Sequence, residues 1–109
     1  MKLTNKEKRA LAEFKKELKK KLKTNLVKII LFGSKARGDA RPDSDIDVLV
    51  VVKRKGEKTI NIIFDEKIKI NSQYNIYISP KIYSLKEYNY FNNIPTFLMY
   101  FIKREGVNI

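Results

Sequence analysis

The amino-acid sequence predicts a small α/β domain in which helices pack on a β-sheet. Two short apolar runs rich in branched residues, 26–32 and 46–52, are typical of buried strands. Around them, apolar residues recur at spacings of three and four, which is the pattern of amphipathic helices. A length of 109 residues suits one domain, so we expect residues 1–109 to form a single unit.

The first predicted element is an amphipathic helix. Thr4 and Glu7 have the spacing of a capping box, in which each side chain accepts a hydrogen bond from the other residue's backbone amide. Lysines crowd the last turns of this helix, where positive charge suits the negative end of the helix dipole. A narrow apolar stripe runs along it and consists of Leu11, Phe14, Leu18 and Leu22.

The middle of the chain predicts a second helix and a third strand. Apolar residues return to helical spacing over 60–68, after a charged loop that contains Gly56. Residues 74–79 alternate as a strand does, and Pro80 stops the pattern. We therefore place the third strand before Pro80.

The C-terminal third predicts two short helices and a final strand at 107–109. Ser84 begins a second capping-box pattern ahead of an aromatic-rich helix. The last helix is expected over 96–105, with Pro95 in its first turn and Gly106 just past its end.

The composition excludes several classes of protein. The chain has no cysteine and no histidine, which rules out a disulfide framework, a thiolate zinc site and any His-based general base. No apolar run approaches the roughly 18 residues needed to span a bilayer. The charged N-terminus lacks the apolar core of an export signal. We therefore expect a cytoplasmic protein without a membrane role.

The formal net charge of +12, from 24 Lys and Arg against 12 Asp and Glu, favours polyanionic partners. Nucleic acid, nucleotide phosphates and an acidic protein all fit that description. Most of the cations are lysines on what should be a solvated helix face, where they serve solubility. An excess of positive charge alone does not establish nucleic-acid binding, so we do not expect nucleic acid to be the partner.

A pair of carboxylates at the head of the second strand carries the first chemical signal. Asp45 and Asp47 are two residues apart, so both side chains point to the same face of the sheet. Two carboxylates held this close repel each other unless a cation lies between them. With oxygen ligands only, that cation would be hard, either Mg²⁺ or Mn²⁺. An isolated Asp-x-Asp pair can also serve only to cap turn amides.

The end of the first strand supplies the second signal. Gly33 lets a ligand approach the backbone closely, and Ser34 can begin a short helical turn whose free amides suit a phosphate. A Gly-Ser pair alone is a common way for a strand to end in a turn. Here ten residues, including Arg37-Gly38, separate it from the carboxylate pair, and chance rarely produces that combination.

The stretches GSKARG at 33–38 and SDIDVLV at 44–50 resemble the signature of the nucleotidyltransferase superfamily typified by DNA polymerase β. The small size resembles its minimal nucleotidyltransferase (MNT) group, and the resemblance covers about residues 25–109. It implies a mixed sheet flanked by helices and a Mg²⁺-dependent enzyme. Such an enzyme transfers a nucleoside monophosphate to an acceptor hydroxyl, and we expect the transferred group to be AMP from ATP. The alternative is an antitoxin-like module that neutralises a HEPN-type partner, with little or no catalysis.

The same resemblance assigns roles to residues of this chain. It implies that Gly33 and Ser34 hold the nucleoside triphosphate, and that Asp45 and Asp47 ligate the metal. Lys35 and Arg37 could stabilise the negative charge of the phosphates. Arg37 could equally well hold its own loop in place.

The family's third carboxylate comes from a later strand, and the matching position in the strand we expect is Asn75. An amide oxygen can ligate Mg²⁺, but it brings no charge and cannot act as a base. The acceptor could complete the site, or catalysis could be largely lost. Other acidic residues could also stand in, namely Asp43, Asp65 or Glu66.

The C-terminal third is rich in aromatic residues. We expect these side chains to form a core and its rim, because they lie on helical segments without a base-stacking strand motif. The MNT group lacks the domain that binds the acceptor in larger relatives, so the resemblance also implies an exposed apolar patch here, for a partner or for a second copy of the chain. The residues concerned are Tyr88, Tyr90, Phe91, Phe97, Tyr100 and Phe101.

Overall fold

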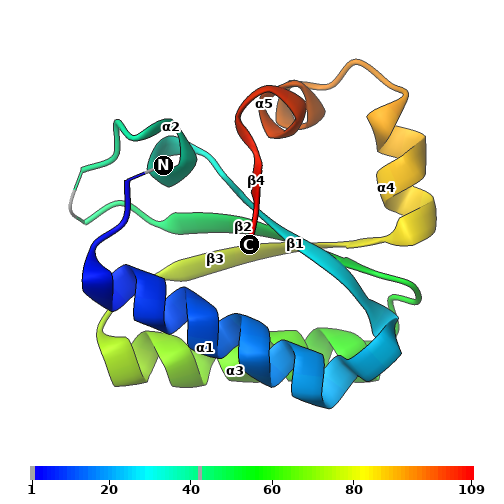
Figure 1. Ribbon diagram of the computed structural model, residues 1–109. Coiled ribbons are helices and arrows are strands. Elements are labelled where there is room, and N and C mark those ends of the chain that lie inside the picture. The colour runs from blue at the N-terminus through cyan, green and yellow to red at the C-terminus, as the bar shows by residue number, and fades with distance from the viewer. Residues whose placement is uncertain (1, 42) are drawn as a thin grey trace.

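The computed structural model describes residues 2–41 and 43–109 and contains a four-stranded mixed sheet with helices on both faces (Figure 1). The strands lie in the order β3-β2-β1-β4. β1 runs antiparallel to β2 and β4, whereas β2 and β3 are parallel. This arrangement confirms the expected mixed sheet flanked by helices. The strand bounds are Leu26–Phe32 for β1, Ile46–Val52 for β2, Ile78–Ser84 for β3 and Val107–Asn108 for β4.

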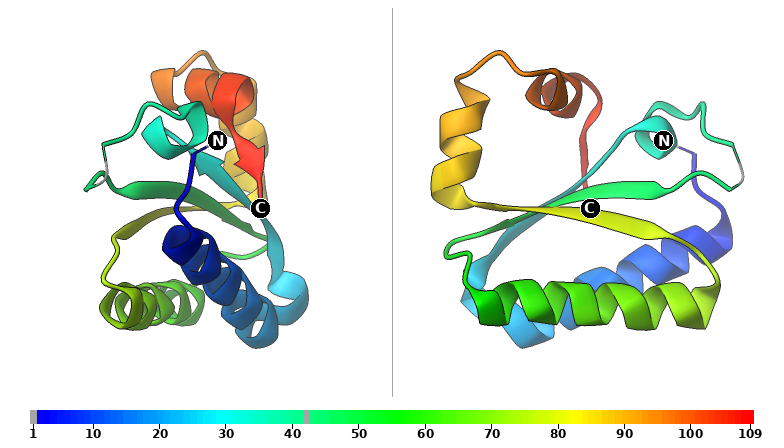
Figure 2. Two further views of the ribbon diagram at one scale, coloured as in Figure 1. Left: turned by 60° about the vertical axis from the view of Figure 1, so that its left-hand side comes forward. Right: turned by 180° about the vertical axis from the view of Figure 1, so that it is seen from behind.

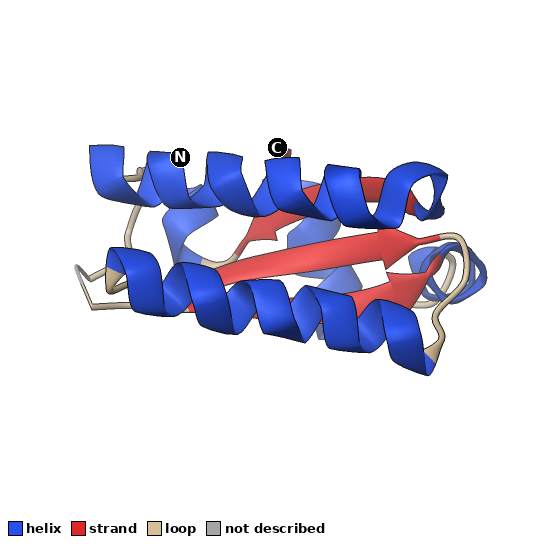
Figure 3. Cartoon of the chain, turned by 90° about the horizontal axis from the view of Figure 1, so that it is seen from below, coloured by secondary structure: helices blue, strands red, loops and turns tan. Residues whose placement is uncertain are grey.

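Two long helices cover one face of the sheet, and three shorter helices lie on the other side (Figures 1 and 2). The long helices, α1 and α3, run side by side beneath the strands (Figure 3). Within the part of the chain that the structure describes, no helix is both long and apolar enough to cross a bilayer. The helix bounds are Asn5–Leu22 for α1, Ser34–Arg37 for α2, Glu57–Tyr74 for α3, Leu85–Asn92 for α4 and Phe97–Glu105 for α5; a 3₁₀ turn, Lys23–Asn25, links α1 to β1.

The alternation of side chains along β2 decides which layer each residue joins. Val48 and Val50 pack in the core beneath the sheet, with α1 and α3. Leu49 and Val51 pack on the opposite face, against Met99 of α5. Asp47 has the same parity as Leu49, so its carboxylate lies on the face that α4 and α5 partly cover.

The third strand differs from the sequence-based prediction. Helix α3 continues to Tyr74, because Ile70 and its neighbours bury an apolar face against the sheet. Asn75 then ends the helix in the left-handed conformation (φ 52°), which Asn tolerates better than most residues. The strand begins only at Ile78 and contains Pro80, which an edge strand accommodates because it has no partner on its outer side.

Helix N-termini largely follow the predicted caps. Both capping boxes form, with Thr4 at the start of α1 and Ser84 at the start of α4. Thr96 caps α5 through its hydroxyl, which accepts a hydrogen bond from the Met99 amide. Pro95 therefore precedes the cap and does not occupy the first turn as expected.

A buried ion pair fastens the start of α1 to α2. The Lys35 ammonium lies 2.8 Å from a Glu7 carboxylate oxygen, and the two side chains are 4% and 8% exposed. The other Glu7 oxygen caps the Thr4 amide, and Lys35 also donates to the Arg41 carbonyl. Burial alone would raise the pKa of Glu7, but the hydrogen bonds from Lys35 and Thr4 hold it below its usual value.

We predict that Lys35→Met lowers the free energy of unfolding by about 3–5 kcal/mol, because it leaves the buried Glu7 carboxylate without its partner. Urea denaturation at neutral pH measures the loss. Lys8→Met, the same change at an exposed residue of α1 next to Glu7, should cost less than about 0.5 kcal/mol. Adding Glu7→Gln to Lys35→Met should recover most of the loss, because Gln still caps Thr4 without a charge. An additive double variant would contradict the ion-pair explanation.

Candidate functional site

Asp45 and Asp47 lie where the chain enters β2, on the face of the sheet opposite to α1 and α3. Asp45 is exposed and Asp47 is half-buried. Burial raises the pKa of the Asp47 carboxyl above its usual value, and the negative charge of Asp45 raises it further. The positive charges of Lys81 and Arg37 oppose this effect. Asp45 is therefore close enough for its charge to act on Asp47, while the shared face of the two side chains stays a prediction, because Asp45 precedes β2.

Gly33 lies directly beside the Asp47 carboxylate. It follows Phe32, which pairs with Asp47 across β1 and β2, and it has a φ of 79°. A Cβ atom at Gly33 would stand 2.5 Å from Asp47 Oδ2, a distance that real Cβ atoms do not reach. Both the backbone conformation and the close carboxylate therefore require glycine at this position.

Helix α2 is a single turn that starts immediately after Gly33. Its backbone returns from Arg37 to the Gly33 carbonyl, and Gly38 ends it in the left-handed conformation. The amides that precede Arg37 have no partner within the helix, as at every helix start. Ser34 begins this turn and is half-buried. The turn thus places Gly33, Ser34 and the carboxylate pair in one neighbourhood.

The two cations of the motif have different positions. Lys35 points into the protein, where its ammonium is committed to Glu7, so the expectation that it steadies phosphate charge is wrong. Arg37 is exposed and forms ion pairs with Asp39 (3.2 Å) and with Glu105 of α5 (3.1 Å). It therefore ties down its own loop, as one of the two interpretations held, while its charge still reaches Asp47.

The structure does not place Asn75 on the strand beside Asp47. Asn75 caps α3 and lines a hollow of about 360 Å³ together with Asp43 and Ser44, and Asp45 and Asp47 are not among the residues that line it. The residue in register with Asp47 on β3 is Ser79. Our placement of Asn75 at the third metal position rested on the wrong strand bounds and is corrected here.

Two acidic residues of α3 are also far from the carboxylate pair. Asp65 and Glu66 belong to the helix that covers the opposite face of the sheet. Glu66 is buried there and forms an ion pair with Lys21 of α1. Across residues 2–41 and 43–109, no three acidic side chains come close enough to share a metal ion. Any metal at this site would therefore have two carboxylate ligands from the described chain.

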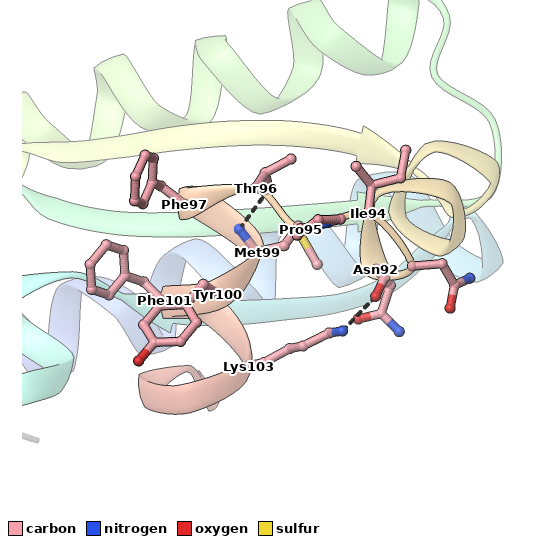
Figure 4. Close-up of a pocket in the computed structure, with 10 residues that line it drawn as sticks. Asn92, Ile94, Pro95, Thr96, Phe97, Met99, Tyr100, Phe101 and Lys103 are labelled. Atoms are coloured by element: carbon pink, nitrogen blue, oxygen red, sulfur yellow. Dashed lines mark hydrogen bonds between the residues drawn. The ribbon is translucent and has the colours of Figure 1, made fainter.

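Helix α5 exposes aromatic side chains instead of burying them all. Phe97 is 87% exposed and Tyr100 is 52% exposed, and together with Phe101 they line an open apolar hollow of about 960 Å³ (Figure 4). Tyr90 of α4 is exposed as well. Only Tyr88 and Phe91 pack against the core. Four of the six aromatic side chains are therefore exposed at the rim and two are packed, and the exposed apolar patch that we expected is present.

Comparison with known proteins identifies the family. The family model described as "Nucleotidyltransferase domain" matches residues 11–105. The chain belongs to the nucleotidyltransferase family. It is 44% identical over 78 residues to a protein of Methanocaldococcus jannaschii named "Putative protein adenylyltransferase MJ0141", a match that covers 67% of this chain and 75% of the relative.

Solved structures share the fold. Spectinomycin adenyltransferase AAD(9) from Enterococcus faecialis, solved with ATP and spectinomycin, aligns with a TM-score of 0.72 at 24% identity; the match covers 94% of this chain and 55% of that enzyme. A structure described as a minimal nucleotidyltransferase aligns with a TM-score of 0.56 at 24% identity and 94% coverage of both chains. A toxin-antitoxin structure with AMP-PNP aligns with a TM-score of 0.57 at 21% identity, over 96% of this chain and 72% of that one.

We predict that Gly33→Ala destabilises the protein by at least about 1 kcal/mol more than Gly38→Ala does, as measured by urea denaturation. Both glycines have positive φ, so both changes carry backbone strain. Only the alanine at 33 meets Asp47, since the nearest atom at Gly38 is 3.7 Å away. In an Asp47→Ala background the excess should vanish. If it persisted, the contact with Asp47 would not be its cause.

Proposed function

We propose that this nucleotidyltransferase domain, residues 1–109, transfers AMP from ATP to an acceptor hydroxyl. The observation that carries the proposal is the Asp47 carboxylate, held against Gly33 and beside Asp45 at the start of a helical turn. The adenylyltransferase name of the Methanocaldococcus jannaschii relative supports AMP as the transferred group. The reaction uses ATP and Mg²⁺, which fits our expectation of a cytoplasmic protein.

The donor set at the site fits a divalent cation. Asp45 and Asp47 offer hard oxygen ligands, which Mg²⁺ and Mn²⁺ prefer. After burial, the charge of Asp45 is the next cause of the raised pKa of Asp47, and this repulsion is relieved when a cation lies between the two carboxylates. When bound, the ion would lower the pKa of the acceptor hydroxyl and neutralise phosphate charge. Asp45 and Asp47 are the residues that would hold it.

The remaining groups of the site position the nucleotide. Gly33 leaves the backbone open beside Asp47, and Ser34 begins the turn whose free amides can donate hydrogen bonds to phosphate oxygens. Arg37, anchored by Glu105, supplies positive charge at the rim. In the reaction the acceptor oxygen bonds to the α-phosphorus, the bond from that phosphorus to the β-phosphate breaks, and pyrophosphate leaves. Positioning and charge stabilisation provide most of the rate in such transfers.

We predict that Asp47→Asn abolishes label transfer from ATP labelled at the α-phosphate, with a loss of at least about 100-fold. The assay contains Mg²⁺ and candidate hydroxyl acceptors, including proteins that co-purify with the enzyme. Asp65→Asn, an equal charge change on the opposite face of the sheet, serves as the control and should retain activity. Transfer that survives Asp47→Asn would refute the assignment of the site.

A second function, antitoxin-like binding of a HEPN-type partner, is favoured by the aromatic patch of α5. Monomeric proteins seldom expose contiguous aromatic side chains without a partner to cover them. Phe97 and Phe101 project from the same side of α5, away from α4 (Figure 4). The toxin-antitoxin structures that share the fold support this function by analogy only. A second copy of the chain is the competing occupant of the patch.

We predict that Phe97→Ser with Phe101→Ser abolishes co-purification with a co-expressed HEPN-type partner, because the patch loses its exposed apolar area. Ile68→Ser, an equally polar change at an exposed residue of α3, is the matched control and should have no effect. If Asp45→Ala with Asp47→Ala still neutralises the partner fully, binding and not transfer is the mechanism. If the wild-type protein instead self-associates and the Phe97→Ser, Phe101→Ser variant does not, a second copy covers the patch.

A further inference from the structure

The register between β2 and β3 identifies the β3 residues that lie on the same face of the sheet as Asp47. In the parallel pair, Asp47 lies opposite Ser79 and Leu49 lies opposite Lys81. Residues in register share a face, so Ser79 and Lys81 project from β3 on the same side as the Asp47 carboxylate. Tyr83, the next residue of this set, packs instead against Phe91 of α4. Of the β3 side chains on this face, Tyr83 packs against α4, and Ser79 and Lys81 lie nearer to Asp47.

Lys81 has the charge and the freedom to bind an anion. Its side chain is exposed, and it forms no ion pair with any carboxylate in the described part of the chain. On β3 it lies two residues after Ser79, the residue in register with Asp47, and on the same face of the sheet. Lys81 thus lies on the Asp47 side of the sheet without being paired to its carboxylate.

We propose that Lys81 binds the triphosphate of the nucleotide, on the β3 side of Asp47. The proposal rests on the proposed function, since it assigns a residue to the same nucleotide site. Arg37 lies at the end of α2, beside β1 and β2, and Lys81 lies on β3. The two cations therefore reach the carboxylate pair from different elements. A nucleoside triphosphate that spans the site would meet positive charge from both.

The alternative role of Lys81 is protection of a sheet edge. β3 is an edge strand, and lysines on edge strands discourage pairing with other chains. That role depends only on solubility and leaves nucleotide affinity unchanged. It also has no effect on metal binding at Asp45 and Asp47. Binding measurements therefore separate the two roles.

A triphosphate contact also has a defined part in the transfer. The acceptor oxygen forms its bond to the α-phosphorus, the bond from that phosphorus to the β-phosphate oxygen breaks, and the electron pair leaves with pyrophosphate. The hydroxyl proton passes to water. The Lys81 ammonium keeps its protons and stabilises the negative charge that grows on the leaving group.

The position of Lys81 has opposite consequences for metal and for nucleotide. An unpaired ammonium on the same face as the Asp47 carboxylate opposes the approach of a divalent cation, so metal alone should bind weakly. The same ammonium favours the triphosphate. Metal and nucleotide should therefore bind together, and each should raise the affinity of the other by the same factor.

We predict that Lys81→Met shifts the two affinities in opposite directions. Calorimetry of the full chain measures Mn²⁺ alone, and then a non-hydrolysable ATP analogue in the presence of Mn²⁺. Affinity for Mn²⁺ alone should rise about twofold to fivefold, because a nearby positive charge is removed. Affinity for the analogue should fall at least about tenfold, because a charge-assisted hydrogen bond is lost. Lys81→Arg should retain most of the analogue affinity.

The control is Lys58→Met, which removes the same charge at an exposed residue in the first turn of α3 and should change neither affinity. Unchanged analogue affinity in Lys81→Met, with tight binding to the wild type, would overturn the role of Lys81 and leave the nucleotide site standing. A wild-type protein that binds no analogue with Mn²⁺ would overturn the proposed function and the role of Lys81 together. Thermal unfolding confirms that each variant is folded.

Discussion

The close approach of the Asp47 carboxylate to Gly33 is the constraint from which the local structure follows. Because Gly33 has no Cβ, the chain can turn sharply out of β1 with a positive φ beside the carboxylate and begin α2 at once. That turn places a helix start beside the carboxylates. Arg37 at the end of α2 and Lys81 on β3 then oppose the repulsion between Asp45 and Asp47.

The loop between β1 and β2 depends on residues far from it in the sequence. Glu7 holds Lys35 from the first helix, and Glu105 holds Arg37 from the last. A loop of this length would otherwise be free to sample many conformations, at an entropic cost for any ligand that must order it. The two ion pairs tie α2 to α1 on one side and to α5 on the other. The motif and the termini of the chain are therefore one structural unit.

The sequence was sufficient for the elements whose pattern is local. Continuous branched apolar runs predicted β1 and β2 with their observed bounds, because strands buried on both faces need no alternation. The spacing of Asp45 and Asp47 likewise predicted that the two carboxylates lie close enough to interact. The third strand was missed because residues 74–79 alternate by chance, whereas burial of Ile70 prolongs α3 to Tyr74. Lys81 could not be found from the sequence, since its position beside Asp47 depends on the register of two strands.

The raised pKa of Asp47 has a consequence for the energetics of the unliganded protein. A carboxyl whose pKa is higher in the folded state binds its proton more tightly there than in the unfolded chain. The contribution of this group to stability is therefore greatest at acid pH, and it declines as the pH rises through the folded pKa. At neutral pH the charged Asp47 carboxylate makes the fold less stable than an uncharged side chain at that position would. Stability alone therefore does not favour a carboxylate at residue 47.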